Sequence, residues 1–106
     1  AKLIGKEGNK RCVGKLSEAI KFYYNPGDVI VLISASGQSQ NVINAAKISQ
    51  ELGLSVITFS GFKPDNPLRN LGENNLWADS NTYNIVEMTH HIWLLAIVDM
   101  IINENE

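Results

Sequence analysis

The chain has very little cysteine and no dominant charge. Cys12 is its one cysteine, so no internal disulfide can form, and no cysteines and histidines share zinc-finger spacing. These absences exclude a disulfide- or zinc-stabilised secreted scaffold and favour a cytoplasmic location. Nine Lys and Arg residues stand against eleven Asp and Glu residues, which gives a net charge of -2. We therefore expect no nucleic-acid partner, because such a surface attracts few phosphates.

Long hydrophobic runs are also lacking. The longest uninterrupted apolar stretch, Ile92–Val98, is far shorter than the ~20 residues that cross a bilayer. The first residues do not combine a basic segment with an apolar one, as a secretory leader does. We therefore expect a soluble protein with no membrane partner. The 106 residues, 44% of them hydrophobic, predict a single globular domain over residues 1–106.

The first half of the chain predicts a helix followed by a buried strand. Apolar residues recur at helical spacing within Val13–Tyr24, and the turn-forming residues Asn25–Asp28 end this helix. Val29–Ile33 is a run of five branched apolar residues. Such a run is typical of a parallel strand that is covered on both faces.

The second half predicts an alternation of helices and strands. A helix ends at Gly53, and a strand follows over Leu54–Phe59. The single helix between this strand and Val29–Ile33 is typical of a parallel β-α-β crossover. A short helix over Asn66–Leu71 and a third strand over Asn75–Asp79 come next. The longest helix is expected over Asn81–Asn103. The sequence therefore predicts an α/β fold with a parallel sheet of three strands.

The later part of this last helix is apolar on nearly every side. From Ile92 to Ile102 only Asp99 interrupts the apolar residues, and one face of a sheet cannot cover so much surface. We expect a second copy of the chain to cover the rest, in a homodimer or homotetramer formed through this helix.

The segment after the first buried strand carries the main functional signal. Ser34, Ser36 and Ser39 surround Gly37 where a strand gives way to a helix, and helix N-termini at this edge of a parallel sheet attract anions. A glycine here would let a phosphate approach the backbone. Serines also cap helices, and spacing alone leaves capping and phosphate binding equally favoured. The common nucleotide-binding glycine motifs are absent.

These residues resemble a known family. Ser34-Ala35-Ser36-Gly37-Gln38-Ser39, followed by Asn41-Val42, is similar to the signature S-x-S-G-x-S-x-N-V of the sugar isomerase (SIS) domain, above all in its phosphoheptose isomerase branch. The resemblance continues through Ile57–Gly61 and through Tyr83–Glu87 with His90. It covers about residues 22–102.

The resemblance implies a three-layer sandwich with a parallel, flavodoxin-like sheet and a phosphorylated sugar as ligand. It also implies aldose–ketose isomerisation in cell-surface polysaccharide synthesis, without a cofactor, in dimers or tetramers that share sites. The family's phosphosugar contacts fall on one loop, at Ser34, Ser36, Gly37, Gln38 and Ser39. A non-catalytic phosphosugar-sensing module remains the alternative.

The chain departs from the family pattern at two places. The family has five strands, with an earlier strand, a G-N-G-G-S-A loop and a helix bearing a catalytic glutamate, none of which the sequence contains. We therefore expect a domain that lacks N-terminal or internal segments. The family's glutamine and histidine on the last helix correspond to Val86 and Leu94.

Other polar residues occur near the start of that helix. Glu87, His90 and His91 lie at i, i+3 and i+4, which predicts one shared face. A solvated ion pair, acid–base chemistry by Glu87 and His90, and a metal site all remain open as interpretations. Neighbouring histidines diverge by about 100° on a helix, so we expect no metal.

Overall fold

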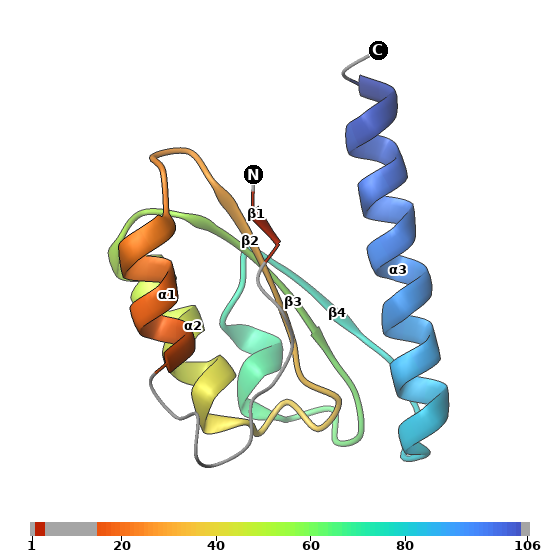
Figure 1. The fold of residues 1–106 in the computed structure, drawn as a ribbon. Coiled ribbons are helices and arrows are strands. Elements are labelled where there is room, and N and C mark those ends of the chain that lie inside the picture. The colour runs from red at the N-terminus through yellow and green to blue at the C-terminus, as the bar shows by residue number, and fades with distance from the viewer. Residues whose placement is uncertain (1, 4–14, 105–106) are drawn as a thin grey trace.

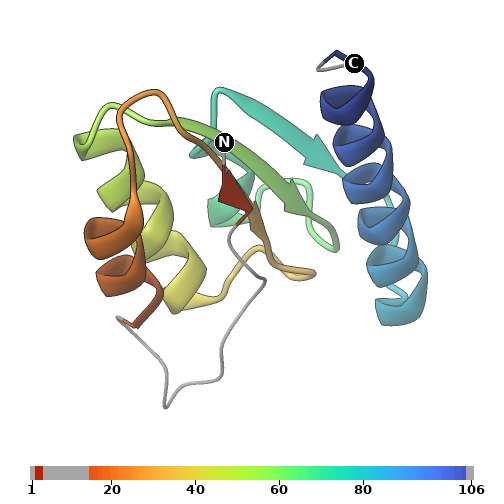
Figure 2. The same ribbon diagram turned by 45° about the horizontal axis from the view of Figure 1, so that its top comes forward.

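The computed structural model describes residues 2–3 and 15–104, which form three layers around a parallel sheet (Figure 1). The strands follow one another across the sheet in chain order: β1 (Lys2–Leu3), β2 (Val29–Ile33), β3 (Ser55–Ser60) and β4 (Asn74–Trp77). The helical segments are α1 (Lys15–Tyr23), α2 (Gln40–Glu51), the short 3-10 helix η2 (Pro67–Asn70) and α3 (Tyr83–Glu104). Figure 2 shows α1 and α2 on one face of the sheet and α3 alone on the other.

The α/β fold with a parallel sheet is confirmed, and one strand needs correction. Three strands were expected, and the described residues form four, because Lys2 and Leu3 pair in parallel with Ile30 and Val31 of β2. A strand of two residues is too short to leave a periodic pattern in the sequence. The predicted helix start at Val13 lies outside the described residues.

The face below α1 and α2 contains the larger core. Nine buried apolar residues from both helices, the central strands and η2 form it: Ile20, Ile30, Leu32, Val42, Ala45, Ala46, Leu54, Val56 and Leu68. In β2 and β3 every residue beyond the first is buried or partly buried, as expected for strands with a helix on each face. These strands hold the loops at their carboxyl ends in fixed positions.

Among the described residues, α3 is the one helix that covers the opposite face. Trp93, Leu94 and Ile97 pack on Val31, Ile33 and Phe59 of the sheet. Most of the helix's other apolar side chains remain exposed. By length and composition α3 could also cross a membrane, and among the described residues it is the single helix that meets this test. Long helices in the cores of soluble proteins meet it too, so the solubility of the chain stays a prediction.

Candidate functional site

The serine loop, residues 34–39, connects the carboxyl end of β2 to the first turn of α2. Ile33 is paired with Phe59, so the serine loop begins beside the loop that follows β3 at the same edge of the sheet. Ser34 N donates to Phe59 O at 3.0 Å, which continues the pairing one residue beyond β2. The structure thus brings the serine loop, the start of α2 and residues 61–66 together.

Each of the three serine hydroxyls accepts a hydrogen bond from nearby main chain. Ser34 Oγ accepts from Gly37 N at 3.1 Å, Ser36 Oγ from Gln38 N at 3.2 Å, and Ser39 Oγ from Val42 N at 3.5 Å. The capping interpretation is therefore confirmed for Ser39, the N-cap residue of α2. These bonds close the loop on itself.

The same bonds leave hydrogen-bond donors for a ligand. A serine hydroxyl can accept and donate at once, and in these contacts the oxygen only accepts. Ser36 and Ser39 are partly exposed, whereas Ser34 is buried. The N–H groups of Gln40 and Asn41 have no acceptor one turn earlier in the helix, and none among the described residues. An anion at this end of α2 would meet these donors and the helix dipole.

Gly37 has a reason for being glycine that differs from the expected one. Its φ is +68°, and a Cβ there would lie 1.9 Å from Oδ1 of Asn66. The missing side chain therefore makes room for Asn66 rather than for a ligand. Gly37 is buried, and Gln38 beside it is exposed.

Asn66 is the residue of this edge that sequence reasoning missed. It caps η2 through its side chain, which accepts from Arg69 N. The sequence does contain a signal for the capping role, since Asn directly before a proline such as Pro67 is a strong N-cap residue. Its contact with the serine loop had no signal in the sequence.

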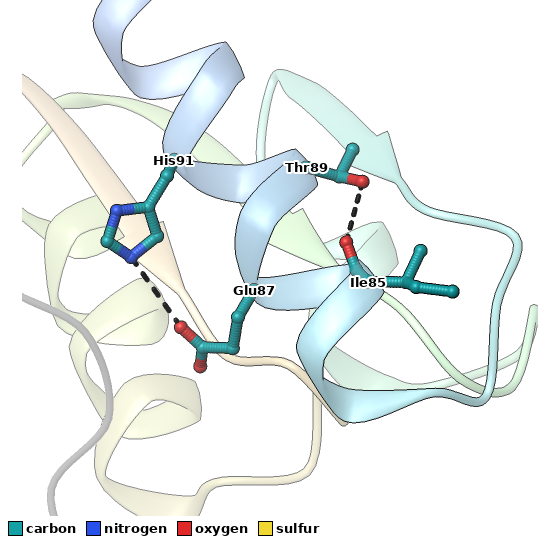
Figure 3. Close-up of polar contacts among 4 residues, drawn as sticks. All are labelled: Ile85, Glu87, Thr89 and His91. Carbon is teal, nitrogen blue, oxygen red and sulfur yellow. Dashed lines mark hydrogen bonds and ion pairs between the residues drawn. The ribbon is translucent and has the colours of Figure 1, made fainter.

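The polar residues at the start of α3 do not share one environment. Glu87 Oε2 lies 3.8 Å from His91 Nε2 (Figure 3). The His91 side chain is 69% exposed, whereas that of Glu87 is only 14% exposed. This contact is an ion pair only while His91 is protonated. The ion-pair interpretation fits these two residues, while acid–base action by Glu87 stays a prediction.

His90 points into the sheet instead. It is 1% exposed, and its ring centroid lies 5.7 Å from those of both Phe59 and Trp93. Its Nε2 is 2.8 Å from Ser60 O, and because a carbonyl only accepts, Nε2 carries the proton. The expectation of one shared face is therefore wrong for His90: the helix turns it toward the core. Its catalytic role stays a prediction, and its burial favours a structural role.

No cluster of three or more His, Cys, Asp or Glu side chains suited to a metal ion occurs within residues 2–3 and 15–104. The three residues Glu87, His90 and His91 are thus not gathered around one point.

The fold and the serine loop together define the class of protein. The family model described as SIS domain matches residues 7–61, more than half of the chain, so the chain belongs to the SIS domain family. Among curated proteins it is similar to the probable phosphoheptose isomerase of Thermoplasma acidophilum, with 32% identity over 80% of the chain and 44% of the relative. The phosphoheptose isomerase of Aliarcobacter butzleri is 35% identical over 74% of the chain and 41% of the relative.

Solved structures give the same result. A phosphoheptose isomerase from Neisseria gonorrhoeae matches with a TM-score of 0.68 and 26% identity, over 89% of this chain and 54% of the other. One from Francisella tularensis matches in fold with a TM-score of 0.72 at 20% identity, over 80% of this chain and 46% of the other. The chain spans less than half the length of these curated relatives, and about half that of the solved chains.

Proposed function

We propose that the serine loop binds the phosphate of a phosphorylated sugar. The observation that carries this proposal is the set of neutral donors at the start of α2: the hydroxyls of Ser36 and Ser39 and the first N–H groups of the helix. Each hydrogen bond to a charged group contributes about 1.5–3 kcal/mol, so this set can hold a phosphate without a lysine or arginine. The buried Ser34 then stabilises the conformation of the serine loop, because its Oγ accepts from Gly37 N.

The reaction that we propose is the aldose–ketose isomerisation of sedoheptulose 7-phosphate or a close analogue. A base takes the C1 proton of the ketose while the C2 carbonyl oxygen gains a proton, which gives an enediol. The proton then returns at C2 while the O1 hydroxyl loses its proton and the C1 carbonyl forms. Glu87 is the better-supported candidate for this base because its side chain keeps 14% of its surface exposed, whereas His90 is 1% exposed and is held on Ser60 O. The names of the relatives support this substrate class. A cytoplasmic location and a role in cell-surface polysaccharide synthesis stay predictions.

A non-catalytic phosphosugar-sensing module is the second candidate. Val86, which corresponds to the family's glutamine, is 0% exposed and packs on Ala35 and Ala78. With His90 also buried, the start of α3 offers a ligand fewer acid–base groups than the isomerisation pattern requires.

Hydrogen exchange into the substrate separates these candidates. The protein is incubated with sedoheptulose 7-phosphate in heavy water, and deuterium at C1 of this ketose and at C2 of the aldose product is followed by NMR while affinity is measured by calorimetry. Exchange supports the isomerase. Binding without exchange, even at high protein concentration, supports the sensing module. If the sugar phosphate does not bind, both candidates are wrong.

We also propose that a second copy of the chain covers α3. Ile85, Met88, Ile92, Leu95 and Ile102 fall at heptad spacing, with Asp99 at the one remaining position, and the five apolar side chains are 51–66% exposed. Such a stripe is typical of a helix that packs against another helix. The stripe does not include Trp93, Leu94 or Ile97, which already contact the sheet.

A further inference from the structure

Asn66 lies at the centre of a buried network between the loop after β3 and the serine loop. It is 2% exposed, and the two hydrogens of its Nδ2 are shared among three acceptors: Ser60 Oγ at 3.1 Å, Gly61 O at 3.1 Å and Lys63 O at 2.9 Å. Its Oδ1 accepts from Arg69 N at 3.0 Å. Every polar atom of this amide therefore has a partner, which fixes the orientation of the side chain.

This side chain also fixes the position of Gly37. Cγ of Asn66 would be 2.3 Å from a Cβ at Gly37, so the two residues are packed as closely as a glycine allows. Leu68 N donates to Gly37 O at 3.1 Å, and Gly37 N donates to Ser34 Oγ. The serine loop is thus held from the outside by η2 and Asn66, and from the inside by Ser34.

We propose that Asn66 is a positioning residue for the phosphate site: it holds Gly37 at positive φ, so that Ser36 and the first turn of α2 face one anion. This inference rests on the proposed function of the serine loop. Capping of η2 accounts for Oδ1 alone, because the three bonds made by Nδ2 all hold residues 60–63. An asparagine that served only as a cap could be replaced by serine without consequence for the ligand.

The substitution Asn66→Ser tests this role because it keeps a good N-cap residue and removes the amide that packs on Gly37. We expect affinity for sedoheptulose 7-phosphate to fall roughly fivefold or more, as for the loss of one or two hydrogen bonds. Asn70→Ser, an exposed change at the end of the same short helix, is the matched control and should leave affinity unchanged.

A double-mutant cycle with Ser36→Ala separates positioning from a general loss of stability. If Asn66 acts through the serine loop, Ser36→Ala should weaken binding less in the Asn66→Ser protein than in the wild type. Additive effects would overturn the inference. Should Asn66→Ser fail to fold, Ser60→Ala removes one acceptor of the amide and should weaken binding in the same direction.

The two proposals fail in different ways. Unchanged affinity in Ser36→Ala would overturn the phosphate site itself. Weaker binding in Ser36→Ala, together with unchanged affinity in both Asn66→Ser and Ser60→Ala, would overturn only the role of Asn66.

Discussion

Gly37 and Asn66 show how one residue's chemistry depends on a partner far along the chain. The glycine could be identified from the sequence as special, but a ligand and a neighbouring side chain are both reasons for a missing Cβ. The structure shows that the neighbouring side chain is the reason, because a Cβ at Gly37 would lie 1.9 Å from Asn66 Oδ1. No local pattern could have indicated this contact, because it joins residues from two different loops.

Ser36 is the residue on which the phosphate proposal is tested most directly. Ser36→Ala removes one hydroxyl donor, and we expect affinity for sedoheptulose 7-phosphate to fall by roughly 10- to 150-fold, the equivalent of one hydrogen bond to a charged group. Isothermal calorimetry measures it. Ser55→Ala, at the amino end of β3, is the control and should bind as the wild type does. If Ser36→Ala and Ser55→Ala bind with equal affinity, the proposal that the serine loop binds phosphate is wrong.

At the scale of elements, the sequence was informative wherever a pattern repeats. Val29–Ile33 was predicted as a buried strand and forms β2, and the helix ending before Gly53 is α2. Two-residue β1 has no period to detect. In α3 the apolar pattern runs nearly all round, so it could not show which of His90 and His91 faces the sheet. Tertiary packing alone buries His90 and exposes His91.

The exposed stripe of α3 makes a prediction at this scale. Ile92→Glu places a charge in the middle of the stripe, so we expect a dimer or tetramer to dissociate while helical content is unchanged, because Ile92 is 64% exposed. Sedimentation velocity gives the mass and circular dichroism the helicity. Lys47→Glu, an exposed change on α2, should leave the mass unchanged. A wild-type chain that is already monomeric would contradict the proposal.

At the scale of the whole molecule, one face of the sheet is closed and the other is only partly covered. Two helices and η2 seal the first, while α3 leaves much of its own apolar surface in solvent. Both edge strands are short, at two residues for β1 and four for β4. The sequence could predict the layers, since each helix follows a strand, but not which surfaces an assembly buries.

Ligand binding should stabilise the whole fold, because the serine loop is hydrogen-bonded to β3, η2 and α2. A ligand at 100 times its Kd adds about 2.7 kcal/mol to the free energy of unfolding, which raises Tm by roughly 10 °C in a domain of this size. Differential scanning fluorimetry with sedoheptulose 7-phosphate measures this shift. Sedoheptulose without phosphate is the control and should give none. Equal shifts for both sugars would place recognition away from the phosphate.

The serine loop is closed by its own hydrogen bonds before any sugar arrives, and this limits what it can do during a reaction. A preformed cradle loses little conformational freedom on binding, so a sugar phosphate can dock in a single step. The same hydrogen bonds restrict the conformation of the serine loop, so it cannot fold over the sugar as a lid. An enediol needs shelter from bulk water. For the proposed isomerisation, that shelter would have to come from a surface beyond the serine loop, and the proposed second copy on α3 is our candidate for it.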